Sequence, residues 1–256
     1  EVGEGTLFVA VPGFHVDGHD YVARAAAAGA AAALVERPVT RTTLPQLVLT
    51  GTRTALAQAA TWWCGDPSRD IGIVGITGTD GKTTTAKLTV HLLEAAGVRS
   101  VDGGNTDTPL VDAVDAVDAD GGDRYDAFVV ECSSFRLAWT PTFRANASAW
   151  LNLQPDHLNW HRSMEAYEAA KAQVFANQRS TDVALGFAAD PVVMRRVAGA
   201  PGVHRSFGVP GADYHSTASA LIGPAGEIAP LDALRRRLPH DVTNALAAAA
   251  LVLETG

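Results

Sequence analysis

The sequence predicts an α/β fold whose sheet is mainly parallel. Apolar, β-branched runs alternate along the 256 residues with alanine-rich stretches of helical character, and this alternation is typical of helices that cover a parallel sheet. One run leads into a glycine-containing segment at residues 78–85 and then a helical pattern, which is the order of a phosphate-binding loop. A linker with Asp-Pro-Ser at residues 65–70 predicts two domains, residues 1–68 and 69–256.

The smaller N-terminal domain is predicted from three apolar runs and two helical stretches. Short apolar runs bounded by glycine, proline or polar residues indicate strands, and alanine-rich stretches indicate helices. A polar, glycine-containing segment at residues 13–20 predicts a loop. The expected elements are, in order, a strand at 6–11, a helix at 21–29, strands at 31–36 and 46–50, and a helix at 52–63.

The larger domain shows the same alternation on both sides of the glycine-containing segment. Its first apolar run ends at that segment, and the helical pattern begins at Lys82. The acidic stretch at residues 115–123 predicts a solvated loop. The expected strands are 71–77, 127–131, 147–153 and 183–185, and the expected helices are 82–96, 163–176, 191–197 and 242–254.

Composition excludes several classes of protein. The net charge of −8 argues against a protein that coats nucleic acid, and the one basic cluster, residues 235–237, is three residues long. No apolar run reaches the roughly 18 residues of a membrane helix. Cys64 and Cys132 have neither disulfide nor zinc-site spacing, so we expect two small buried side chains in a reducing, cytoplasmic compartment.

The glycine-containing segment carries the chemistry of a phosphate-binding loop. Its glycines allow the backbone to come close to an anion, and the N–H groups at the following helix start point toward it. Lys82 can reach the terminal phosphates of a nucleotide, and the Thr83 hydroxyl can bind Mg²⁺. Ile76 occupies the position of the first glycine in the strict Walker spacing, so the loop is a variant. The predicted nucleotide-binding residues of the loop are Gly78, Thr79, Asp80, Gly81, Lys82, Thr83 and Thr84.

Further acidic, imidazole and amine side chains follow the later strands. Glu131 ends one strand and His157 follows another, where parallel strands deliver side chains to the crevice at their carboxyl ends. Lys171 lies on the next predicted helix, where it could equally be an exposed lysine paired with Glu165 or Glu168. The loop alone is compatible with a GTPase, a kinase or a ligase. A phosphate loop followed along the chain by Glu131, His157 and Lys171, in that order, favours one family.

The combined pattern resembles the Mur ligase family, which makes bacterial peptidoglycan precursors by ATP-driven amide formation. Residues 5–10, Gly13, Asp17-Gly18 and Gly29-Ala30 are similar to the UDP-sugar domain of the members that add diaminopimelate or lysine. The larger domain is more similar to the members that add D-glutamate, and it receives more weight because it covers more residues. That similarity lies in Gly103-Gly104-Asn105, Thr108-Pro109-Leu110, Glu131-x-Ser133-Ser134-Phe135 and residues 156–165.

The resemblance implies a reaction and its substrates. A carboxylate of UDP-N-acetylmuramoyl-L-alanine would attack the γ-phosphate of ATP to give an acyl phosphate, and the amine of D-glutamate would then displace phosphate. Addition of diaminopimelate or lysine is the alternative within the family. No nucleic-acid or membrane partner is expected.

The resemblance also implies the role of each candidate residue. Lys82 and the loop amides would hold the β- and γ-phosphates. Thr83 and Glu131 would hold one Mg²⁺, and His157 with a carbamylated Lys171 would hold a second. The implied catalytic residues are Lys82, His157 and Lys171. Asn105 would contact ATP, Asn244 would lie on the adenine side, and Ser133 would contact the substrate.

The sequence departs from the family pattern mainly at the adenine end. Asp241 stands where the family has the first asparagine of a His-Asn-x-x-Asn motif, and residues 187–190 replace an Asn-x-Asp-Asp turn. Asp80, Arg136 and Asn159 are further departures, of which Asp80 replaces the more usual asparagine. The phosphate end therefore matches better than the adenine end.

The extent of the chain predicts a fragment of a longer protein or a degenerate gene product. The family's third, C-terminal domain is not in the sequence, and the UDP-sugar domain is incomplete, because the chain begins at Glu1 without the family's preceding Asp-Ser-Arg segment. We expect the isolated chain to bind nucleotide weakly and not to complete ligation. A non-catalytic nucleotide- or UDP-sugar-binding module is therefore the alternative for this chain. A P-loop hydrolase is disfavoured because its Asp-x-x-Gly run, residues 118–121, lies in the acidic loop and not at a strand end.

Overall fold

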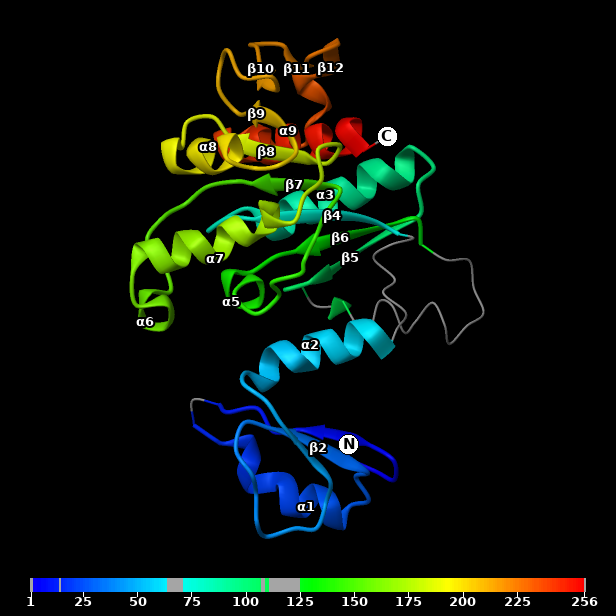
Figure 1. The fold of residues 1–256 in the computed structure, drawn as a ribbon. Helices are drawn as coiled ribbons and strands as arrows, with labels where there is room; N and C mark the ends of the chain where they lie inside the picture. Colours follow the sequence, from blue (N-terminus) through cyan, green and yellow to red (C-terminus); the bar gives the residue numbers. More distant parts are fainter. Residues whose placement is uncertain (1, 14, 64–70, 107–108, 111–124, 256) are drawn as a thin grey trace. The chain divides into compact units, whose positions relative to one another are not determined.

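The computed structural model describes residues 2–13, 15–63, 71–106, 109–110 and 125–255 (Figure 1). Contacts divide the chain into two compact units, residues 1–67 and 68–256, beside the predicted boundary at residue 68. The predicted linker at 65–70, Cys64 and the predicted acidic loop at 115–123 lie outside the described residues. Cys132 is buried, as expected. No helix in the described ranges is long and apolar enough to cross a membrane.

The first unit is a three-stranded parallel sheet in the order β1-β2-β3 with helices beside it. Its small core contains Ala10, Val22, Ala33 and Val35. The predicted strands and first helix form, each shorter than expected. The elements are β1 (Leu7–Val9), η1 (Gly18–Tyr21), α1 (Val22–Ala27), β2 (Ala32–Val35), β3 (Gln46–Val48) and α2 (Thr52–Trp63).

A partly buried polar network joins the carboxyl ends of β1 and β2 to the start of α2. The Thr52 hydroxyl donates to the Ala10 carbonyl at 3.0 Å, and Glu36 Oε1 accepts from the Thr52 N–H at 2.9 Å. His19 Nε2 accepts from the Glu36 N–H at 2.9 Å, and its Nδ1 lies 2.7 Å from Asp17 Oδ1. These bonds fix the loop edge of the sheet, where α/β folds bind ligands.

The second unit is built on a six-stranded, fully parallel sheet in the order β5-β6-β4-β7-β8-β9, which confirms the predicted α/β fold class. The strands are β4 (Gly72–Thr77), β5 (Ser100–Gly104), β6 (Ala127–Glu131), β7 (Ala147–Trp150), β8 (Val183–Phe187) and β9 (Val203–Phe207). The helices are α3 (Lys82–Ala95), α5 (Ser134–Leu137), α6 (Leu158–His161), α7 (Met164–Ala176), α8 (Pro191–Ala198) and α9 (Pro239–Thr255).

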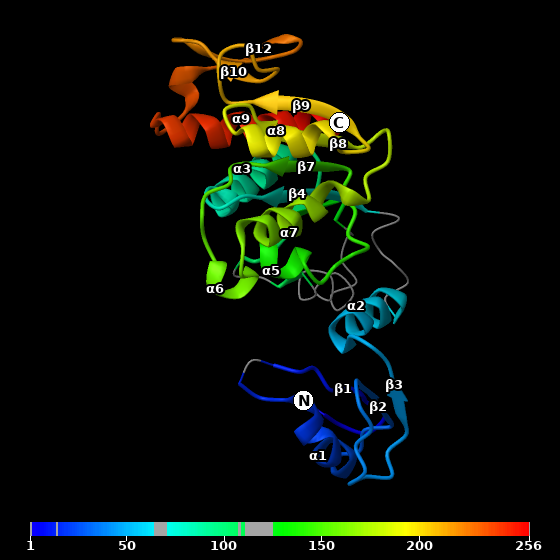
Figure 2. The ribbon, with the colours of Figure 1, turned by 60° about the vertical axis from the view of Figure 1, so that its left-hand side comes forward.

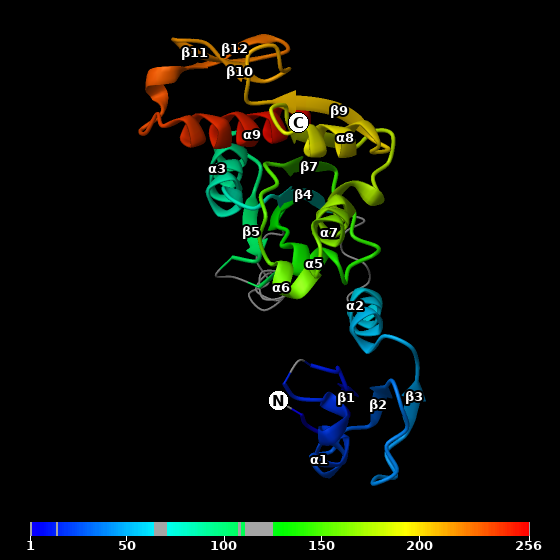
Figure 3. The ribbon, with the colours of Figure 1, turned by 90° about the vertical axis from the view of Figure 1, so that its left-hand side faces the viewer.

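Helices cover both faces of this sheet, as Figures 2 and 3 show. The side chains of Val74, Ile76 and Val129 point to one face, where they pack with α3 and α9. Phe128 and Val130 point to the other face, where they pack with α7 and α8. This alternation is the period of two of a strand, and burial on both faces makes these strands almost wholly apolar.

Several elements were not predicted. Strand β5 contains Asp102 and two glycines, and β9 contains His204, Arg205 and Ser206, so neither reads as an apolar run. A small antiparallel sheet of β10 (His215–Ser216), β11 (Ala220–Gly223) and β12 (Gly226–Pro230), followed by η3 (Leu231–Ala233), was missed because its strands are short. The last helix begins at Pro239, not at the predicted 242, and the strand predicted at 147–153 ends at Trp150.

Close packing between β8 and α8 generates a stability prediction. A Cβ atom at Gly186 would lie 2.6 Å from Val197 Cγ2 and 3.0 Å from Val193 Cγ1. We expect Gly186→Ala to lower the free energy of unfolding by about 1–3 kcal/mol through overpacking. Gly199→Ala is the matched control, because its Cβ would meet nothing closer than 3.8 Å. Urea titrations of both variants test this, and equal midpoints for the two would contradict it.

Candidate functional site

The candidate site lies at the carboxyl edge of the six-stranded sheet. The chain goes from β4 to β5 on one side of the sheet, returns to β6 and then crosses to β7 on the other side of β4. A change of direction of this kind opens a crevice beside the ends of the central strands. The loop at residues 78–81 occupies it, directly between β4 and α3.

The loop needs glycine at position 81 for two reasons. Gly81 precedes α3 with a φ of 84°, in the left-handed region that glycine adopts most easily. A Cβ atom there would also lie 2.6 Å from Asn244 Oδ1. The side chain of Asn244, which comes from α9, is therefore placed directly beside the phosphate loop.

The side chain of Asn152, which follows β7, supports the loop with three hydrogen bonds. Its Oδ1 accepts from the N–H groups of Thr79 at 2.9 Å and Asp80 at 3.0 Å. Its Nδ2 donates to the Asp80 carbonyl at 3.1 Å. Sequence reasoning assigned Asn152 no role, although its position just beyond a predicted strand is a usable signal.

Three predicted residues meet on the α3 side of the loop. The exposed Thr83 donates from Oγ1 to Glu131 Oε2 at 2.7 Å, and Asn105 Nδ2 lies 3.4 Å from Glu131 Oε1. Glu131 is only 3% exposed, so Thr83 and Asn105 are hydrogen-bond partners of a buried carboxylate. Lys82 Nζ donates to the Thr79 carbonyl at 2.8 Å, and Thr84 is exposed.

Lys171 lies beneath the loop and is not an exposed helix lysine. It is 2% exposed, its Nζ donates to the Gly78 carbonyl at 2.6 Å, and Nζ lies 4.6 Å from the centre of the Tyr167 ring. The alternative pairing with Glu168 is wrong, because Glu168 binds Arg195 and Arg196. Burial, assisted by the nearby charge of Lys82, lowers the pKa of Lys171 to about 7.

His157 lies at the start of α6 with its ring partly exposed. Its φ is 53°, an unusual value for a residue other than glycine. The ring centre lies 4.7 Å from that of Phe135 and 6.2 Å from that of Tyr167, while Nε2 lies 3.3 Å from Asp156 Oδ2. Tyr167 thus contacts both His157 and Lys171, which brings the two predicted residues to the same ring.

Ser133 and its neighbour Ser134 have different surroundings. Ser133 Oγ accepts from the Arg136 N–H at 3.4 Å and so begins α5, with 7% of the residue exposed. Ser134 Oγ lies 2.9 Å from His161 Nε2, inside the protein. No role was predicted from the sequence for Ser134, His161 or Tyr167. Tyr167 Oη lies 3.3 Å from Thr79 Oγ1 of the loop.

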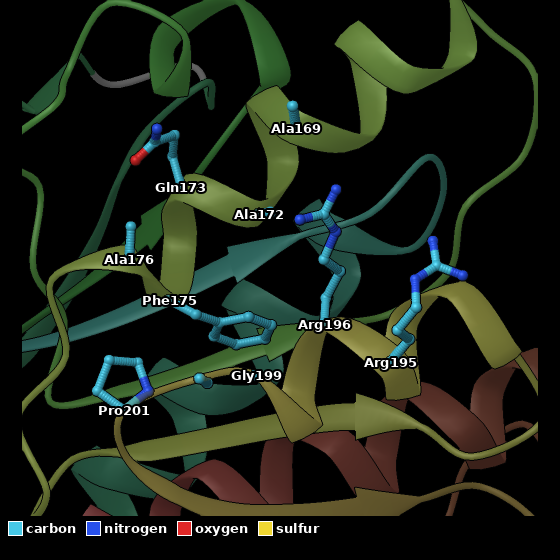
Figure 4. A pocket seen from close by; sticks show the side chains of 10 residues that line it. Ala169, Ala172, Gln173, Phe175, Ala176, Arg195, Arg196, Gly199 and Pro201 are labelled. Atoms are coloured by element: carbon cyan, nitrogen blue, oxygen red, sulfur yellow. The ribbon is translucent and has the colours of Figure 1, made fainter.

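A separate cavity lies between α7 and α8. It has a volume of about 510 Å³ and is lined by Arg195, Arg196 and the α7 residues Ala169, Ala172, Gln173, Phe175 and Ala176 (Figure 4). None of the residues that line it belongs to the loop or to the predicted site, so the cavity is separate from the loop site. No three His, Cys, Asp or Glu side chains in the described ranges gather closely enough to hold a metal ion alone.

Comparison with known families and sequences gives a consistent result. The profile of the Mur ligase middle domain matches residues 76–252, and that of the Mur ligase family catalytic domain matches residues 1–60. UDP-N-acetylmuramoylalanine–D-glutamate ligase of Thermobifida fusca is 41% identical over 199 residues, covering 72% of this chain and 41% of that protein. A Pseudomonas putida ligase named for 2,6-diaminopimelate is 35% identical over 195 residues, covering 68% and 39%. The chain thus spans less than half the length of these relatives.

Solved structures share the fold at lower identity. A UDP-N-acetylmuramoyl-L-alanyl-D-glutamate–2,6-diaminopimelate ligase superposes with a TM-score of 0.78 and 21% identity, covering 100% of this chain and 58% of that one. MurF ligase from Thermotoga maritima in complex with ADP gives a TM-score of 0.68 and 22% identity, covering 100% and 61%.

The buried Lys171 generates a prediction about the pH dependence of stability. Its pKa is about 7 when folded, against about 10.4 when unfolded. Below pH 7 Lys171 is protonated in both the folded and the unfolded state, so the folded state bears the full cost of burying the ammonium. Between the folded and unfolded pKa values the unfolded state binds more protons, so the free energy of unfolding rises with pH. Relative to Lys171→Met, we expect the free energy of unfolding of the native protein to rise by about 2 kcal/mol between pH 7 and pH 9. Urea titrations across that interval test this; parallel curves would rule it out.

Proposed function

The chain belongs to the Mur ligase family, and we propose that it carries the ATP-binding centre of a ligase that joins D-glutamate to UDP-N-acetylmuramoyl-L-alanine. The observation that carries this proposal is the phosphate loop with the Thr83–Glu131 contact of 2.7 Å at its end. Such an enzyme would act in the cytoplasm, where ATP is available.

The nucleotide would bind at the loop. Lys82 and the backbone N–H groups of residues 78–84 would hold the β- and γ-phosphates, because a helix start and a lysine both stabilise anions. Asn105 lies against Glu131 and Asn244 lies against Gly81, and both would contact the nucleotide. Asn244 lies against Gly81, so we assign it to the loop end of the nucleotide as well as to the predicted adenine side.

The residues at the loop fit a magnesium ion. Thr83 Oγ1 and Glu131 Oε2 lie within hydrogen-bond distance of each other. Both are hard oxygen atoms, the type of ligand that Mg²⁺ prefers. Thr83 and Glu131 would therefore hold the ion. A bound Mg²⁺ would supply positive charge to neutralise the phosphates during transfer.

His157 and Lys171 are proposed for the second ion and for catalysis. As an amine, Lys171 donates to Gly78 and is not a metal ligand. Its pKa of about 7 leaves a substantial neutral fraction, which is the form that can add to CO₂ and lose one proton to give a carbamate with ligand oxygens. His157 would join it in holding the second Mg²⁺, and Ser133 would contact the substrate near the start of α5.

The proposed ligation would proceed in two steps. A substrate carboxylate oxygen attacks the γ-phosphorus, ADP leaves, and an acyl phosphate forms. The amine of D-glutamate then attacks the acyl carbon, phosphate leaves, and the amine loses one proton. Because phosphoryl transfer depends mainly on positioning and charge, the role of the loop is to hold the phosphates in line with the carboxylate.

The first unit is proposed to bind the UDP-sugar. The match of residues 1–60 to a Mur ligase profile supports this, together with the ordered carboxyl edge at Ala10, Glu36 and Thr52. Diaminopimelate addition is the second candidate, favoured by the relative from Pseudomonas putida at 35% identity. D-glutamate leads because the relative from Thermobifida fusca is 41% identical.

A substrate-choice assay tests the proposed reaction. The complete gene product that contains this chain is incubated with ATP, Mg²⁺, UDP-N-acetylmuramoyl-L-alanine and D-glutamate, and the product is identified by mass spectrometry. We expect a D-glutamyl product with one ADP and one phosphate for each ligation. A product only with UDP-N-acetylmuramoyl-L-alanyl-D-glutamate and diaminopimelate would support the second candidate. ATP hydrolysis that no acceptor stimulates would contradict both.

The loop lysine provides a more specific test. We expect Lys82→Ala to lower ATP-dependent turnover by at least ~100-fold, because the variant lacks the positive charge that would stabilise the transferring phosphate. The melting temperature should change by less than about 2 °C, because a loop lysine packs little. Lys87→Ala, an exposed lysine one turn further along α3, is the matched control and should keep its turnover. Unchanged turnover in Lys82→Ala would remove the loop from the mechanism.

A further inference from the structure

The single-turn helix α6 is held in a strained backbone conformation. Among the described residues, only two other than glycine have a positive φ, and they bracket this turn: His157 at 53° and Arg162 at 66°. A left-handed conformation brings the Cβ atom of an ordinary residue close to its own backbone, so it persists only where surrounding contacts enforce it. Something outside the turn must therefore hold it.

His161 makes the buried contacts of this turn with the rest of the second unit. This residue is 7% exposed, and its ring stacks on that of Phe135 with an interplanar angle of 21° and lies 5.1 Å from that of Tyr167. His161 Nε2 lies 2.9 Å from Ser134 Oγ, and Ser134 is only 2% exposed. Burial, with the charges of His157 and Lys171 nearby, lowers the pKa of His161 and so favours the neutral ring.

The hydrogen bond connects two segments that are distant in sequence. Ser134 opens α5 directly after β6, whereas His161 ends the turn that begins after β7. A buried donor and acceptor that lose each other would each be left without a partner, so the bond fixes the spacing between the two segments. The same two segments supply Phe135 and His157, whose rings lie 4.7 Å apart.

We propose that the Ser134–His161 hydrogen bond is a positioning device that holds the α6 turn, and with it the His157 imidazole, against the Tyr167 and Lys171 side of the phosphate loop. Ser134 and His161 act through His157 and do not touch the reacting atoms. The catalytic part of this proposal rests on the proposed ligase function; the placement of His157 does not.

The two segments give a double-variant test in the complete gene product. We expect Ser134→Ala and His161→Phe each to lower kcat about tenfold, with the KM for ATP within twofold of the native value. The double variant should also lose about tenfold, because both changes remove the same bond. His161→Gln, whose amide can reach Ser134, should recover at least half of the lost kcat. Ser219→Ala, an exposed serine in the turn between β10 and β11, is the matched control.

Multiplied losses in the double variant, or an undiminished kcat in the single variants, would overturn the proposal. Side-chain nuclear magnetic resonance of His157 gives a readout that needs no turnover. In this chain, Ser134→Ala should shift or broaden the His157 ring signals and leave those of the exposed His204 unchanged. Unmoved His157 signals would refute the positioning role. If the native protein fails to ligate D-glutamate while the His157 signals respond, the proposed function fails and the positioning role stands.

Discussion

The phosphate loop is held from both faces of the sheet, and the rest of the site depends on that constraint. Lys171 reaches the Gly78 carbonyl from α7 on one face, and Asn244 lies against Gly81 from α9 on the other. Asn152 binds the backbone at Thr79 and Asp80 between them. Because these inward contacts fix the loop backbone, the fold sets its shape without a ligand, and the proposed binding of phosphates there would order few additional groups.

The order of the strands makes this arrangement possible. With β6 on one side of β4 and β7 on the other, the residues just beyond these strands flank the loop. Glu131 ends β6 and Asn152 follows β7, so a carboxylate reaches Thr83 at the end of the loop from one side of β4 and a carboxamide reaches the loop backbone from the other. The apolar side chains of the same strands are buried under helices on both faces, which keeps the strand ends rigid.

The parts of the site that follow local rules were predictable from the sequence. The pattern of glycine, lysine and threonine predicted the loop, and the apolar run at 127–131 predicted a strand that ends at Glu131. The helical spacing of Tyr167, Ala170, Lys171 and Val174 places Lys171 on the buried side of α7, but it does not show that the partner is the Gly78 carbonyl, 93 positions earlier. The Asn244–Gly81 and Ser134–His161 contacts likewise exist only after folding. In the fold, β5 and β9 escaped prediction because their polar residues and glycines hide the strand pattern.

The buried lysine also has an evolutionary consequence. An ammonium group with a lowered pKa inside the protein costs stability through its burial, and its hydrogen bond to the Gly78 carbonyl offsets part of that cost. Selection for stability alone would therefore favour an apolar side chain of similar length only where the Gly78 carbonyl found another donor.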